Sequence, residues 1–193
     1  MVLGAAALSV YTYAGSSTST MNVSVSVGHS CSMDSNPMAF GAYDGFVANA
    51  STALESTATV VSTCTSGASA LITINAGASA GSGSADAPVR RMTAGAGKYL
   101  IYQVYSDVAR GTVWGNTSPT GVALTGTGVS QTLTAYGSVL AAQPAAQGVY
   151  SDQLGVTITY WCWHEHCHRP LAAYFFAWSR HRHRNPHLYW SER

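Results

Sequence analysis

The chain has 193 residues, a formal net charge of +1 and only 9% charged side chains. This length fits one domain with a single core, and 19 glycines among many Ser, Thr, Ala and Val residues favour short strands joined by turns over a helical bundle. A single lysine and a near-neutral charge argue against nucleic-acid binding, and no apolar run reaches the roughly 18 to 20 residues of a membrane-spanning helix.

The amino-terminal residues 1–14 resemble a secretion signal. Residues 2–10 are apolar and rich in Ala and Leu, and small residues follow at the positions that a signal peptidase reads. No Lys or Arg precedes this run, so a buried Ala-rich segment is the alternative interpretation. If residues 1–14 are a signal, the chain is exported.

The next segment, residues 15–28, contains a strict alternation of apolar and polar side chains. The apolar positions are Met21, Val23, Val25 and Val27, and the polar residues between them are Asn22, Ser24 and Ser26. A period of two residues predicts a strand with one buried face. Further runs that alternate or are rich in β-branched residues predict strands at 57–64, 70–75, 98–105, 130–136 and 153–160. Turn residues separate these runs, so the sequence predicts an antiparallel sandwich or barrel.

Two cysteines, Cys31 and Cys64, lie beside predicted strands. In an exported chain such a pair is expected to form one disulfide, which would stabilise the fold by roughly 3 to 4 kcal/mol through loop closure. Two separate buried thiols are the alternative. A catalytic cysteine is not expected, because the neighbouring His29 is poorly suited to act as its base.

The remaining candidates for chemistry are three aspartates and a set of aromatic side chains. Asp44, Asp107 and Asp152 lie in turn-like contexts, where a carboxylate usually caps its own backbone. The aromatic side chains lie beside strands and turns, which favours packing over a sugar-binding platform. They are Phe40, Tyr43, Tyr99, Tyr102, Tyr105, Trp114, Tyr136 and Tyr150. The sequence therefore predicts neither an enzyme nor a cofactor site.

Several short blocks, taken together in their order and spacing, resemble the spore coat protein U domain family, the subunit family of archaic (Csu-type) chaperone-usher pili. The first blocks are Cys31, the run Met-Ala-Phe-Gly-Ala-Tyr-Asp at 38–44, and the run Val-Val-Ser-Thr-Cys-Thr at 60–65. Later blocks follow at 91–92, 100–107, 113–115, 136–137, 148–152 and 157–160. The resemblance covers residues 17–160.

This resemblance implies an all-β fold, an incomplete immunoglobulin-like β-sandwich over residues 29–160. Such a sandwich lacks its final strand and is completed by a donor strand from a neighbouring subunit. Met21, Val23, Val25 and Val27 match the donor residues of the family. An ordinary first strand that pairs within its own domain is the alternative.

The function implied by the resemblance is that of a structural subunit of an extracellular pilus (fimbria) that serves adhesion and biofilm formation. Its implied partners are neighbouring copies of the chain, a periplasmic chaperone that fills the groove first, and an outer-membrane usher. The resemblance thus implies secretion through the periplasm. A secreted coat or surface protein with the same fold is an alternative role.

The last segment, residues 161–193, has a different composition from the rest of the chain. It has a net charge of +3, against −2 for residues 1–160, and holds six of the seven histidines. Cys162, His164, His166 and His168 recur with a period of two, so an extended tail would place them on one face, where sulfur and imidazole ligands suit zinc or copper. A metal-binding secreted protein is therefore another hypothesis. The favoured alternative is an unstructured extension, translated past the usual end, with no selected role.

Overall fold

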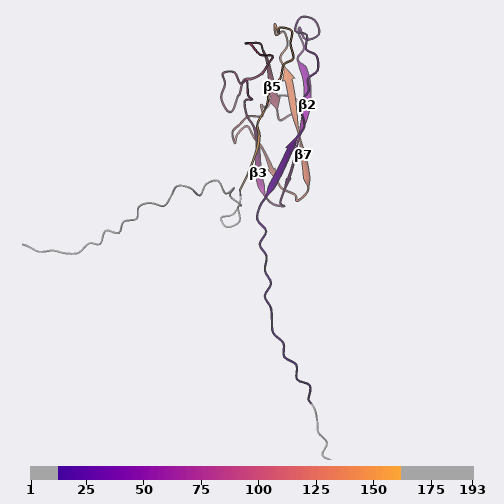
Figure 1. The fold of residues 1–193 in the computed structure, drawn as a ribbon, viewed down its shortest axis with the longest axis vertical. Helices are drawn as coiled ribbons and strands as arrows, with labels where there is room; N and C mark the ends of the chain where they lie inside the picture. The colour runs from indigo at the N-terminus through magenta and orange to yellow at the C-terminus, as the bar shows by residue number, and fades with distance from the viewer. Residues whose placement is uncertain (1–12, 162–193) are drawn as a thin grey trace, which may run out of the picture.

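The structure is a computed structural model, and it describes residues 13–161. In that range it contains eight strands and no helix (Figure 1). The strands are β1 (Cys31–Ser35), β2 (Leu54–Cys64), β3 (Ser69–Ile74), β4 (Arg90–Thr93), β5 (Tyr99–Tyr105), β6 (Val122–Thr125), β7 (Ser130–Val139) and β8 (Val156–Tyr160). The predicted all-β class is confirmed, and the described residues include no helical segment with the length and apolarity of a membrane span.

The strands form two antiparallel sheets that pack as a sandwich. One sheet has five strands in the order β1-β2-β7-β5-β4, and the other has three in the order β6-β3-β8. Buried side chains from both sheets form one core, with Val60, Val104 and Val139 from the larger sheet and Ile72 from the smaller. The indole of Trp114 is 1% exposed and donates a hydrogen bond from Nε1 to the carbonyl of Ile72, 2.8 Å away. This arrangement is an incomplete immunoglobulin-like sandwich.

Five of the six strands predicted from the sequence occur close to the expected positions, as β2, β3, β5, β7 and β8. The last of these begins at Val156 rather than at 153, since residues 150–154 line a groove and Ser151 forms an isolated bridge with Thr93 of β4. Three short strands, β1, β4 and β6, were not predicted. They have four or five residues each and include polar or charged side chains, so their pairing depends on longer neighbours rather than on an alternating pattern.

The half-buried strand predicted at residues 21–27 is wrong for the isolated chain. The segment forms no strand in the described part of the chain. Figure 1 shows it leaving one end of the sandwich as an extended trace. Met21, Val23, Val25 and Val27 are 87%, 87%, 91% and 78% exposed. Pairing as an ordinary first strand therefore does not occur, because no surface of the described sandwich covers the apolar face of this segment.

Cys31 and Cys64 form a disulfide at the end of the sandwich from which residues 13–28 depart. The two residues stand opposite each other in the β1–β2 register, with 4.1 Å between their Cα atoms. The bond joins positions 33 residues apart and thereby ties the short edge strand β1 to β2.

Replacing both cysteines with alanine is expected to lower the free energy of unfolding by about 3 to 4 kcal/mol, because the unfolded chain regains the entropy of a long open loop. Urea unfolding of the double variant and the wild type under oxidising conditions measures this difference. Adding a reductant should shift the wild type toward the variant and leave the variant unchanged. Equal unfolding midpoints for the two proteins under oxidising conditions would contradict the prediction.

Candidate functional site

Strand β8 has one paired edge and one edge that no described strand covers. It pairs with β3 from Ala70↔Tyr160 to Ile74↔Val156, and in the part of the chain that the structure describes it has no second strand partner. The smaller sheet has three strands and the larger has five, so the smaller sheet covers only part of the inner face of the larger. Unpaired N–H and C=O groups on such an edge form a template for another strand.

A groove lies beside this open edge. It consists of two hollows of about 710 and 550 Å³ that share Met38, Phe40, Met92 and Tyr150 in their lining. One wall is residues 36–43, which follow β1, and the other is residues 145–154, which lead into β8. The floor is the hydrophobic core. The floor residues include Val60, Ile74, Tyr102, Val104, Ala135, Leu100 and Val139.

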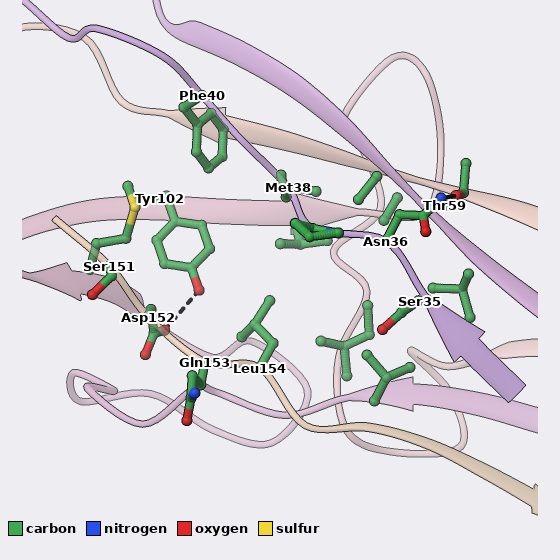
Figure 2. Close-up of a pocket in the computed structure, with 18 of the residues that line it drawn as sticks. Ser35, Asn36, Met38, Phe40, Thr59, Tyr102, Ser151, Asp152, Gln153 and Leu154 are labelled. Atoms are coloured by element: carbon green, nitrogen blue, oxygen red, sulfur yellow. Dashed lines mark hydrogen bonds between the residues drawn. The ribbon is translucent and has the colours of Figure 1, made fainter.

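The first wall is held in place by hydrogen bonds at both of its ends. The backbone N–H of Asn36 donates to the carbonyl of Thr59 at 2.9 Å, and the Asn36 amide donates to the Thr59 hydroxyl at 2.8 Å. At the far end the hydroxyl of Tyr43 donates to the carbonyl of Leu140 at 2.8 Å. Figure 2 shows Phe40, from this wall, above Tyr102 on the floor, and the ring centroids of Phe40 and Tyr102 lie 6.0 Å apart. The wall is therefore ordered although it contains no strand.

The second wall contains a polar cluster centred on Asp152 (Figure 2). The Tyr102 hydroxyl donates to Oδ2 of Asp152 at 2.8 Å, and the N–H groups of Ala78 and Ser79 donate to Oδ1 at 3.0 and 3.2 Å. Burial raises the pKa of Tyr102, and its hydrogen bond to Asp152 raises that pKa further. The phenol therefore stays protonated as a donor, and this cluster fixes the wall to the loop that follows β3.

The expected capping role of the aspartates holds for two of the three. The Asp44 carboxylate accepts hydrogen bonds from the N–H groups of Phe46 and Val47. Asp107 accepts from the backbone N–H groups of Gly111 and Thr112, which hold the pKa of its carboxyl below its ordinary value. Asp152 instead caps a loop more than 70 residues away in the sequence, so its contribution to the groove wall was missed.

The first wall packs against a glycine of β7, Gly137, whose lack of a side chain leaves room for Met38 and Phe40. A Cβ atom at Gly137 would overlap Met38 Sδ and the ring of Phe40. Gly137→Ala is therefore expected to push both side chains off the sheet and to lower the free energy of unfolding by about 1 to 3 kcal/mol. Urea unfolding measures the loss, and Gly111→Ala, where a Cβ atom would lie 3.7 Å from Oδ2 of Asp107, controls for the removal of a glycine. An unchanged free energy of unfolding in Gly137→Ala would contradict the prediction, because it would show that Met38 and Phe40 move aside without loss of stability.

The structure places the sequence-predicted donor residues outside the groove of their own chain. Residues 21–27 span about 20 Å when fully extended. Nothing in the local sequence marked Met38 or Phe40 as groove residues, because neither belongs to an alternating run, whereas Leu154 lies in the predicted run at 153–160. For the first two the only signal was the family-like block at 38–44.

Other sequence predictions fall outside the described residues. Residues 1–12 of the expected signal lie there, and so do Cys162, His164, His166 and His168 of the metal hypothesis. Among residues 13–161, no three side chains of His, Cys, Asp or Glu gather as a metal site would require.

Comparison with known proteins identifies relatives of the chain. The profile of the Spore Coat Protein U domain family matches residues 17–157. Protein U of Myxococcus xanthus is 36% identical over 169 residues, which cover 82% of this chain and 94% of that protein. Among solved structures, the sandwich is similar to a chain in the CsuC–CsuE chaperone–tip adhesion subunit pre-assembly complex from the archaic chaperone-usher Csu pili of Acinetobacter baumannii. That similarity has a TM-score of 0.46 and 16% identity, and it covers 67% of this chain and 39% of that chain.

Proposed function

The chain belongs to the spore coat protein U domain family, and from this premise we propose that it is a structural subunit of an extracellular pilus. One observation carries the proposal. The sandwich has a groove with an apolar floor beside the segment that leads into the open-edged strand β8, and the same chain presents an alternating segment whose apolar side chains are exposed. The exposed apolar side chains of this segment in one copy match the apolar floor of the groove in the next copy.

In the proposed assembly, residues 15–28 of one subunit enter the groove of a neighbouring subunit as a donor strand. The donor backbone would pair with the free edge of β8, and Met21, Val23, Val25 and Val27 would point to the apolar floor. Burying four such side chains would contribute roughly 6 to 12 kcal/mol before the cost of ordering the segment. Because each copy offers a donor segment at one site and a groove at another, the contact does not close on itself and produces a filament.

The rest of the proposal concerns the path to the cell surface. Residues 1–14 act as the export signal, residues 29–160 form the pilin domain, and residues 161–193 are an extension that follows this domain in the sequence. A periplasmic chaperone covers the groove until an outer-membrane usher exchanges it for the donor strand of the next subunit. The fibre serves attachment and biofilm formation. This role is structural, and it requires no catalytic group and no cofactor.

Expression of the full chain together with a periplasmic chaperone and an usher of the archaic type tests the proposal. Surface material is run on a denaturing gel with and without boiling. Donor-strand contacts are expected to give a ladder of multimers in the unboiled sample and a single monomer band after boiling. A chain that reaches the cell surface but runs as a monomer in both samples would overturn the proposal.

A further inference from the structure

One end of the sandwich presents apolar side chains on ordered loops. We call Phe46, Val47, Leu140 and Val149 the tip patch; they are 76%, 78%, 44% and 90% exposed. The Asp44 carboxylate accepts hydrogen bonds from the N–H groups of Phe46 and Val47, and the N–H of Ala142 donates to the carbonyl of Asn49 at 2.8 Å. The loops that carry Phe46, Val47 and Leu140 are therefore fixed to one another, and the apolar side chains of the patch stay in the solvent.

The tip patch flanks one mouth of the groove. At that mouth the walls are residues 41–43 and 145–150. Phe46 and Val47 follow the first wall directly in the sequence, and Val149 belongs to the second. The opposite end of the sandwich, which we call the base, holds the start of β1, the end of β8 and the turns at 65–68 and 126–129. The base also exposes apolar side chains, since Val129 is 65% and Trp161 58% exposed.

The direction of a donor strand decides where the incoming subunit lies. Every strand pairing in both sheets is antiparallel, and an antiparallel donor is the more stable addition to β8. Since β8 runs toward the base, such a donor enters at the base and leaves the groove at the tip patch. A parallel donor would instead leave at the base, where residues 28–30 of the acceptor already lie against Thr65 and Trp161.

In the incoming subunit, the linker between the donor strand and the sandwich is too short to let that sandwich move away from the acceptor subunit. Four residue steps separate Val27 from Cys31, which the disulfide anchors in the base. Four steps reach at most about 14 Å. The base of the incoming subunit must therefore lie against the loops at the mouth of the groove.

We infer that the tip patch of each subunit packs on the base of the next copy of this chain, so that each junction in the fibre has a second contact besides the donor strand. This inference rests on the proposed function. The apolar side chains of the tip patch lie against Val129 and Trp161 of the neighbouring copy. This contact removes exposed apolar surface from water at both ends of the subunit and stiffens the junction.

Photo-cross-linking in assembled fibres tests the inference. Benzoylphenylalanine replaces Phe46 in the full chain, and it replaces Asp34 in a control, because Asp34 is exposed on the side of the sandwich. Irradiated fibres are digested, and the cross-linked peptides are identified by mass spectrometry. The probe at 46 is expected to join peptides of another copy that contain residues 28–31, 65–68, 126–129 or 161, and the probe at 34 is not.

A second variant measures what the contact contributes. Phe46→Asp combined with Val47→Asp is expected to leave the unboiled ladder in place and to lower the temperature at which it collapses. Fibres that form but cross-link from position 46 to other segments or to nothing, or that collapse at the wild-type temperature in the double variant, would overturn the inference and leave the proposed function standing. A wild-type chain that forms no ladder would overturn both.

Discussion

Val25→Arg is expected to abolish the ladder of multimers while leaving the folded subunit unchanged. Val25 is 91% exposed in its own chain, so the arginine removes no contact from that fold. In the groove of a neighbouring copy the same side chain would face the apolar floor, where a guanidinium without a partner costs several kcal/mol and the favourable burial of valine is lost. A gel of unboiled surface material, compared with the wild type, measures the effect.

The alternation of the donor segment provides a matched control for this variant. Ser24→Arg introduces the same charge one residue away, on the face that would point out of the groove, and is expected to retain most of the ladder. The contrast also tests register, because a slip of one residue would bring the serines to the floor. Equal loss in both variants would indicate a general effect of charge on export. Equal retention would mean that residues 21–27 are not the donor.

The alternation at residues 21–27 shows what a pattern can and cannot predict. A period of two residues records that one face of a strand becomes buried, and it carries no information on which chain buries it. The prediction of a half-buried strand was therefore wrong for the isolated subunit, in which Val23 and Val25 are exposed. The same pattern remains the reason to expect a partner outside the chain.

The groove itself was expected only from the family resemblance, because its position depends on tertiary contacts. The two walls of the groove come from segments more than 100 residues apart in the sequence. The groove is open because the smaller sheet covers only part of the inner face of the larger sheet. The long strands β2 and β7 were predictable because their own β-branched and alternating residues favour the strand. The burial of Arg90 was not predictable from the sequence. Arg90 and Arg91 are adjacent and identical, and only the pairing of β4 with β5 decides which one faces the core.

Arg90→Ala is expected to lower the free energy of unfolding by about 3 to 5 kcal/mol, because it would leave several buried carbonyls without donors. The side chain is 0% exposed and burial lowers its pKa to about 10, so it remains charged at neutral pH. Nη2 donates to the carbonyls of Ile74 and Trp114 at 2.9 and 2.7 Å, and Nε donates to the carbonyl of Asn75 at 2.9 Å. One guanidinium on the larger sheet thus binds the end of β3 in the smaller sheet. Urea unfolding with tryptophan fluorescence, which includes Trp114, measures the loss.

Arg91 supplies the control, because it also binds backbone carbonyls but lies nearer to water. Its Nε and Nη2 atoms donate to the carbonyls of Ser79 and Ala80 at 3.1 and 2.8 Å, and its guanidinium lies 4.1 Å from the centre of the Tyr99 ring. Water can replace these donors, so Arg91→Ala is expected to cost about 1 kcal/mol or less. Arg90→Lys keeps the charge but loses the planar guanidinium with its several donors. Its loss in free energy of unfolding should therefore lie between the losses of the two alanine variants. If Arg90→Ala and Arg91→Ala unfold at the same urea concentration, the buried guanidinium does not tie the two sheets together.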